Sequence, residues 1–115
     1  MSLKRGSIVF IPFHFTDLSN YKIRPGLVLN TTEQNDLLIA FISKVIPQVV
    51  GPADFLITKD TKLFIDSGLK YDSIVKCNKI TTLSASLILG ELGELPDNVM
   101  KTEINKRLKI ALGIS

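Results

Sequence analysis

The stretch Leu37-Leu38-Ile39-Ala40-Phe41-Ile42 is apolar at every position, and it decides the fold. A strand that is apolar on both faces is typical of the middle of a sheet. On its N-terminal side, Leu27-Val28-Leu29 predicts a neighbouring strand, entered through Arg24-Pro25-Gly26 and separated from the first by the polar segment 31–36. Further strands are predicted at Ser7-Ile8-Val9-Phe10-Ile11, closed by Pro12, and at Phe55-Leu56-Ile57, Leu63-Phe64-Ile65 and residues 73–77.

Helix signals are confined to the C-terminal third. Ser84 can cap a short segment in which Leu87 and Ile88 face inward. Pro96-Asp97 is typical of a helix start, and Gly113 is a good stop. Between them, apolar residues recur at helical spacing and predict core or dimer packing: Met100, Ile104, Leu108, Ala111, Leu112. Strands followed by helices, without βαβ alternation, predict a mainly β protein: a small antiparallel barrel or curled sheet with helices packed outside.

Composition indicates one ordinary globular domain over residues 1–115, with 45% hydrophobic and 22% charged residues. No apolar run approaches the roughly 18–20 residues of a membrane span, and the first residues lack the order of a secretory signal. A single cysteine, Cys77, cannot form an internal disulfide, so we expect a reducing cytoplasm. The formal net charge of +3 permits a polyanionic partner without requiring one.

The sequence carries no motif of a phosphate-binding loop, a serine hydrolase or a zinc protease. With one His and one Cys, the chain alone cannot build a His/Cys metal site. An enzyme of this sequence should therefore work without metal or cofactor. Cys77 itself is typical of a small buried hydrophobe rather than of a nucleophile.

Two single residues are candidates for phosphate chemistry. Pro25 restrains Arg24 to an extended conformation, so this guanidinium is held at the mouth of a strand, where it can clamp a phosphate. The simpler interpretation is a solvated arginine. Ser43 follows Phe41 on one strand face and can donate to a phosphate oxygen or simply satisfy a strand end.

The segment from 14 to 22 holds the only His of the chain, whose pKa is ordinarily near neutrality. The side chains of this segment could stack on a base, read its edge and contact phosphate, or could form a solvated turn. Its polar and aromatic members are His14, Asp17, Asn20, Tyr21 and Lys22.

Together these segments resemble the MazF/PemK (Kid) family of toxin endoribonucleases. Arg5-Gly6-Ser7-Ile8-Val9-Phe10-Ile11-Pro12-Phe13-His14-Phe15-Thr16-Asp17 is similar to the opening of the family, and Ile23-Arg24-Pro25-Gly26-Leu27-Val28-Leu29 to its Arg-Arg-Pro-Ala-Leu-Val-Leu. Leu38-Ile39-Ala40-Phe41-Ile42-Ser43 resembles the third strand of the family. Residues 67–83 and Leu92-Gly93-Glu94-Leu95 resemble its closing segments.

The resemblance implies an SH3-like β-barrel with a C-terminal helix, working as a cytoplasmic homodimer. Family members cut single-stranded RNA without metal by attack of the 2′-hydroxyl, which leaves a 2′,3′-cyclic phosphate and a 5′-hydroxyl. A cognate antitoxin covers the RNA groove, and operator DNA is a partner only of the toxin–antitoxin complex.

Carried over by position, Arg24 matches the catalytic Arg of the family, and Ser43 falls where the family usually has a catalytic Thr. Lys76 and Asn78 fall where some members have Arg and a catalytic Asp. Because Asn78 cannot act as a base, His14 and Asp17 are the alternatives for proton transfer. We therefore expect Arg24 and Ser43 to face one shared cavity. The predicted RNA-binding residues are Phe15, Thr16, Asn20, Tyr21, Lys22, Lys44, Lys76 and Asn78.

Two other functions remain open. A CcdB-like gyrase inhibitor shares this barrel but depends on C-terminal residues that include an aromatic, which the tail Ala111-Leu112-Gly113-Ile114-Ser115 lacks. A catalytically weak or inactive RNA-binding module is favoured by Ser43 and Asn78.

Overall fold

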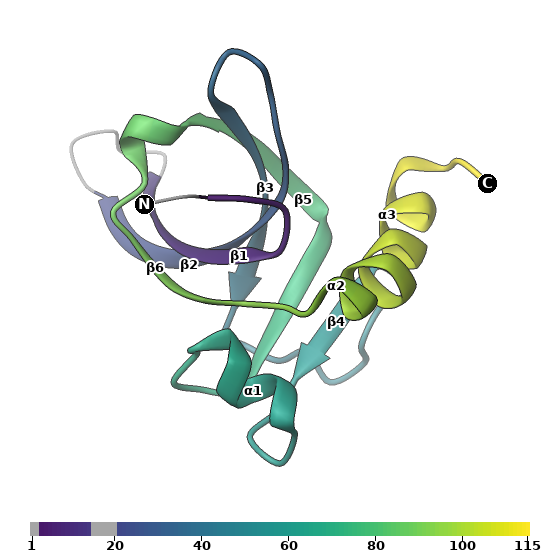
Figure 1. The fold of residues 1–115 in the computed structure, drawn as a ribbon. Coiled ribbons are helices and arrows are strands. Elements are labelled where there is room, and N and C mark those ends of the chain that lie inside the picture. The colour runs from purple at the N-terminus through teal and green to yellow at the C-terminus, as the bar shows by residue number, and fades with distance from the viewer. Residues whose placement is uncertain (1–2, 15–20) are drawn as a thin grey trace.

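The computed structural model of the chain describes residues 3–14 and 21–115, in which strands predominate (Figure 1). Six strands form one antiparallel sheet, and a helical segment follows at the C-terminus. In chain order the elements are β1 (Ser7–His14), β2 (Tyr21–Thr31), β3 (Asp36–Ser43), β4 (Asp54–Ile57), α1 (Lys62–Ser67), β5 (Ser73–Ser84), η1 (Ala85–Leu87), β6 (Gly90–Glu94), α2 (Asp97–Val99), η2 (Met100–Ile104) and α3 (Asn105–Leu112).

The strand order across the sheet is β4-β5-β3-β2-β1-β6, so β3 lies inside the sheet, as its apolar sequence predicts. The sheet curls on itself, and α2 to α3 lie outside it (Figure 1). The α3 helix packs on β5, and its Arg107 Nε donates to the carbonyl of Asp54 in the neighbouring strand β4 at 2.7 Å. The expected fold, a small barrel-like sheet with a C-terminal helix, is confirmed.

Alternation along the strands divides the interior into two cores. Ile8 and Leu27 belong to a core that also includes Met100 and Ile104 from the helical segment. Their neighbours Val9 and Val28 point to the opposite face and form a second core. The remaining members of the second core, buried or packed against it, are Ile11, Leu37, Ile39, Leu3, Phe41, Leu83, Ala85 and Ile88.

Pro12 does not close the first strand, because β1 continues to His14 with Pro12 paired to Ile23. The neighbour on the other side, β6, pairs with β1 only as far as Phe10. The Phe10 carbonyl accepts from the Leu89 N–H on that side at 3.0 Å. Two residues on, the N–H that proline lacks would point to the same side, where no strand of the described residues pairs with β1.

The segment Leu63-Phe64-Ile65 was predicted as a strand, and this prediction is wrong: it lies in α1. The helix ends at Gly68, whose φ of 73° is left-handed, and a Cβ there would lie 2.1 Å from the Leu92 carbonyl oxygen. Gly68, a residue typical of a helix stop, is the sequence signal that the strand prediction overlooked.

The predicted C-terminal helix starts after Pro96 and ends at Gly113, but its middle turn, η2, is π-helical. Arg5 reaches this turn from the N-terminal segment: its guanidinium donates to the Met100 carbonyl and to the Asn105 side chain. No helix within residues 3–14 and 21–115 is long and apolar enough to cross a membrane.

One apolar side chain was assigned wrongly to the interior, and a second belongs to the stripe predicted for core or dimer packing. Leu87 is 47% exposed, although Ser84 caps its segment as predicted by accepting from the Ser86 N–H, and Ile88 does pack on the second core. Leu112 is exposed at the end of α3, whereas Met100 and Ile104 of the same stripe are fully buried.

Candidate active site

A fork between β2 and β3 forms the candidate site. The two strands pair only as far as Gly26 and Phe41. Beyond this pair, β2 stays with β1 and β3 stays with β5. Arg24 and Ser43 each lie two residues past the last pair, so they stand on opposite sides of the fork and share one face of the sheet. Arg24 is therefore inside a strand rather than at its entrance, where the sequence predicted it.

Close packing holds the vertex of the fork. A Cβ on Gly26 would lie 2.5 Å from Cγ2 of Ile39 and 3.4 Å from Cδ1 of Ile11, so only glycine fits without displacement. Just beyond the vertex, the rings of Phe13 and Phe41 meet edge to face, with centroids 5.1 Å apart. These aromatic rings join the β1–β2 side of the fork to the β3–β5 side.

A groove of about 670 Å³ runs through the fork and takes in both Arg24 and Ser43. Among the described residues, no Asp or Glu lines it, whereas six of its 18 lining residues are Lys or Arg. The full lining is Phe10, Phe13, Lys22, Ile23, Arg24, Pro25, Phe41, Ile42, Ser43, Lys44, Val45, Leu69, Lys70, Tyr71, Ser73, Lys76, Lys79 and Leu92. The groove thus concentrates positive charge that the net +3 of the chain does not suggest.

Most of this charge is not neutralised by neighbours. The ion pairs in the described part of the chain involve other cations: Lys4, Lys62, Lys101 and Arg107. Within residues 3–14 and 21–115, no ion pair to a carboxylate is formed by Arg24, Lys44, Lys70, Lys76 or Lys79. Basic side chains that lack acidic partners are well suited to bind a polyanion.

The hydroxyl of Ser43 is oriented by the backbone. Its Oγ accepts a hydrogen bond from the Val45 N–H at 3.0 Å. This contact fixes an otherwise mobile rotamer and leaves the hydroxyl proton for donation, because a serine hydroxyl both accepts and donates. Satisfaction of the strand end and donation to a ligand, which the sequence offered as alternatives, are therefore compatible.

Lys44 and Tyr71 form a second polar feature at the groove. The Lys44 Nζ lies over the Tyr71 ring, 5.1 Å from its centroid, and the tyrosine is 56% exposed. A cation–π contact of this kind combines a phosphate-binding charge with an aromatic ring on which a base can stack.

The structure brings together five of the predicted site residues in the groove: Arg24, Ser43, Lys22, Lys44 and Lys76. Tyr21 and Asn78 are exposed and do not line it. His14 ends β1 opposite Tyr21. The other predicted residues, Phe15, Thr16, Asp17 and Asn20, lie outside the described part of the chain.

Sequence reasoning missed four polar lining residues: Lys70, Tyr71, Ser73 and Lys79. Lys70 and Tyr71 follow α1, a segment that the strand prediction misread. Lys79 lies beyond the strand predicted at residues 73–77. A cluster of Lys70, Lys76 and Lys79 within ten residues was the available signal.

Cys77 takes no part in the groove. It is fully buried in the first core, and this burial raises the pKa of its thiol to about 11, although the nearby Arg107 opposes the rise. A buried, protonated thiol is not a nucleophile at neutral pH, in agreement with the structural interpretation. Within the described residues, no three His, Cys, Asp or Glu side chains are grouped to hold a metal ion.

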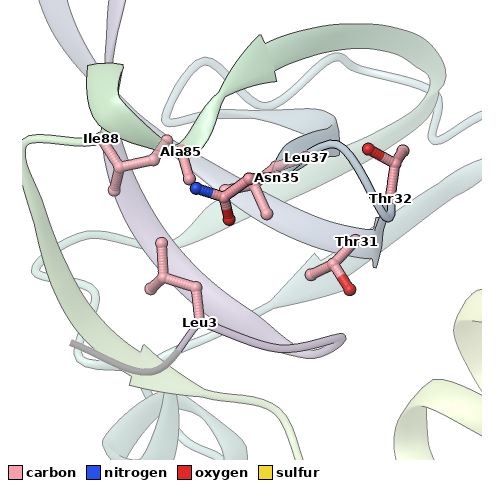
Figure 2. Close-up of a pocket in the computed structure, with 7 residues that line it drawn as sticks. All are labelled: Leu3, Thr31, Thr32, Asn35, Leu37, Ala85 and Ile88. Atoms are coloured by element: carbon pink, nitrogen blue, oxygen red, sulfur yellow. The ribbon is translucent and has the colours of Figure 1, made fainter.

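A second, smaller cavity of about 310 Å³ opens at the other end of the second core (Figure 2). The side chain of Asn35 lies among the apolar side chains of Leu3, Ala85 and Ile88. Thr31 and Thr32 complete its polar edge. Because no charged side chain among the described residues lines this cavity, it suits a phosphate far less than the groove does.

Comparison with known proteins gives a family and a fold. The family model described as PemK-like, MazF-like toxin of type II toxin-antitoxin system matches residues 4–112. No protein of curated function matches the sequence.

Solved structures cover almost the whole chain. A mycobacterial endoribonuclease in complex with its cognate antitoxin is 20% identical with a TM-score of 0.73, covering 99% of this chain and 98% of that chain. The MazE–MazF complex (Form-II) of Deinococcus radiodurans is 20% identical with a TM-score of 0.72, covering 100% and 99%. Mycobacterium tuberculosis toxin MazF-mt6 is 14% identical with a TM-score of 0.68, covering 93% and 98%. These likenesses show the fold, and the family match over 4–112 shows that the chain belongs to the PemK-like, MazF-like toxins of type II toxin–antitoxin systems.

Proposed function

We propose that this chain is an endoribonuclease that cleaves single-stranded RNA in the groove between β2 and β3, as the toxin of a toxin–antitoxin pair. One observation carries the proposal: Arg24 and Ser43, far apart in sequence, line one groove rich in unpaired cations. Family membership and similar structures described as an endoribonuclease or a MazF toxin support it.

The proposed reaction needs no atom from outside the RNA. The 2′-oxygen bonds to the adjacent phosphorus as its proton passes to a base, and the bond from phosphorus to the 5′-oxygen breaks as that oxygen takes up a proton. The products are a 2′,3′-cyclic phosphate and a 5′-hydroxyl. Arg24 binds the phosphate oxygens, on which negative charge accumulates, and the Ser43 hydroxyl donates to one of them.

His14 and Asp17 are the proposed proton carriers, since an arginine is too basic to accept a proton at neutral pH. The charge that a metal ion would neutralise falls to the cations of the groove, so we expect cleavage without metal. Lys22, Lys44 and Lys76 bind flanking phosphates, and Phe15, Thr16, Asn20, Tyr21 and Asn78 complete the proposed RNA contacts.

An antitoxin is the proposed protein partner, and two of the similar structures are complexes with one. An acidic extended segment would fit the cationic groove and compete with RNA for it. We also propose a homodimer. Exposed apolar residues of the loop after β3 support this assembly, since Val45 is 73% and Val49 is 81% exposed.

Mapping of cuts in a long transcript tests the proposal. Wild type should give discrete fragments with cyclic-phosphate ends, in excess EDTA as well as in magnesium. Arg24→Ala should lose about 10²–10³ in rate. Arg24→Lys should remain well below wild type, because lysine lacks the forked donor geometry. Lys106→Ala, which removes an exposed charge outside the groove, is the control and should cleave like wild type.

Three outcomes would contradict parts of the proposal. Wild-type cleavage by folded Arg24→Ala would remove the catalytic assignment. Loss of activity in EDTA that magnesium restores would refute metal independence. Intact RNA, with or without binding, would refute the nuclease, and inhibition of gyrase with intact RNA would favour the CcdB-like alternative.

A further inference from the structure

The longest strand, β5, changes face in its middle. Ala40 of β3 pairs with Ile80, whereas the next residue, Phe41, pairs with Lys76. While β3 advances by one residue, β5 therefore advances by four, and residues 77–79 form an insertion. Such a bulge redirects the side chains around it.

The register shows which side chains are redirected. Ala40 and Phe41 are successive residues, so they point to opposite faces of the sheet. Their partners Ile80 and Lys76 must do the same, although an even separation along a regular strand would put them on one face. Lys79 precedes Ile80 and so turns to the face of Lys76.

The groove agrees with this reading of the register. Both Lys76 and Lys79 line it, whereas Asn78, which regular alternation would have put beside Lys76, does not. Within the described residues, neither lysine forms an ion pair with a carboxylate. Asp54 pairs with Lys76 across the strands, but its carboxylate accepts from the Gly51 N–H at 3.0 Å.

We propose that Lys79, turned by the bulge onto the face of Lys76, binds an RNA backbone phosphate next to the one that Arg24 and Ser43 hold. This inference rests on the proposed function and concerns its substrate contacts. Lys79 takes the place in the groove that sequence position alone gives to Asn78. It positions the substrate and is not a catalytic residue, so its loss should raise KM and leave kcat unchanged.

Salt dependence of binding separates a phosphate contact from a structural effect. The probe is a fluorescent 12-nucleotide RNA of mixed sequence with every 2′-hydroxyl methylated, which cannot be cleaved by 2′-oxygen attack. Each phosphate contact to a single strand contributes about 0.7 to the slope of log Kd against log salt. Lys79→Ala should lower the slope by about 0.7, which raises Kd about fivefold at 0.1 M salt.

Matched variants complete the test. Lys79→Arg should keep the wild-type slope, and so should Asn78→Ala, because a neutral amide releases no counterion from the RNA. Lys106→Ala controls for the loss of one charge from the chain as a whole. All variants are compared by thermal melting, so that a folding defect is detected.

The results separate this inference from the proposed function. An unchanged slope in Lys79→Ala, an equal change of slope in Asn78→Ala, or a wild type that does not bind the probe would overturn the role of Lys79. Cleavage of a long transcript by wild type, together with an unchanged slope in Lys79→Ala, would leave the nuclease standing and remove only the Lys79 contact. If wild type fails to cleave RNA but Lys79→Ala shows the expected change of slope, the Lys79 contact stands and the nuclease proposal is refuted.

Discussion

Replacement of Gly26 by alanine should strain the vertex of the fork. The new Cβ would lie 2.5 Å from Cγ2 of Ile39, which is fully buried. Carbon atoms in contact lie about 3.5–4.0 Å apart, so roughly 1 Å of displacement is needed. Overpacking of this kind costs about 1–3 kcal/mol, and the reduced freedom of the unfolded chain offsets about 0.4–1 kcal/mol.

We therefore expect Gly26→Ala to lower the free energy of unfolding by about 1–2 kcal/mol, which for a chain of this size lowers Tm by roughly 4–8 °C. Because the shift separates β2 from β3, it also moves Arg24 relative to Ser43. At a temperature where the variant is folded, RNA cleavage should fall about 10- to 100-fold.

Gly90→Ala is the matched control. A Cβ at Gly90 would meet only Cδ2 of Phe10, at an ordinary 3.8 Å, so its Tm and its rate should equal those of wild type or its Tm should rise slightly. Urea or thermal unfolding followed by circular dichroism measures the stability. A Gly26→Ala protein that melts as high as Gly90→Ala would refute the packing argument, since the two changes differ only in what the added methyl meets.

Three further perturbations address the chemistry and the core. Ser43→Ala should lower the cleavage rate at least tenfold with an unchanged Tm, and Ser43→Thr should retain activity; equal loss in both variants would argue against the hydroxyl as donor. The cleavage rates of His14→Gln and Asp17→Asn should each be measured from pH 5 to 9 beside wild type. The proton carrier is the residue whose replacement abolishes the rise or the fall of the rate with pH, and two unaltered profiles would exclude both residues. Burial raises the pKa of the Cys77 thiol to about 11 from an ordinary 9.0, so the folded protein retains a proton that the unfolded chain loses first. The stability that this thiol contributes is complete below pH 9 and is lost as pH rises toward 11, so the free energy of unfolding should fall by about 2 kcal/mol between pH 8 and pH 10.5. In urea unfolding, Cys77→Ala should lack this part of the fall. Parallel curves of unfolding free energy against pH for the two proteins would contradict it.

Strand content and the central place of β3 could be predicted from sequence because each depends on a run of neighbouring residues. Leu37 to Ile42 is apolar throughout, and a strand buried on both faces leaves that pattern. The strand prediction for the α1 segment was wrong because it, too, depended only on a run of neighbouring residues. Leu63, Phe64 and Ile65 are locally strand-like, whereas the helix that contains them ends at a left-handed Gly68 against β6.

The site was less accessible to sequence reasoning. Arg24 and Ser43 were chosen through a family resemblance, and their shared groove depends on where β2 and β3 stop pairing. Lys79 rather than Asn78 lines the groove because of a bulge in β5, and the pairing of β5 with β3 sets the position of that bulge. Alternation counted along one strand cannot reveal such a change of face.

The divergence of β2 from β3 has a consequence for how the proposed ribonuclease activity could be tuned. Arg24 belongs to the paired strands β1 and β2, and Ser43 belongs to the paired strands β3 and β5. Between the two, the described residues provide the Gly26–Phe41 pair and the contact of the Phe13 and Phe41 rings. The distance between Arg24 and Ser43 is therefore set at the vertex of the fork rather than within either pair of strands. Substitutions of the apolar residues around the vertex can widen or narrow the groove, and so alter turnover and RNA preference, without changing any residue proposed to contact phosphate.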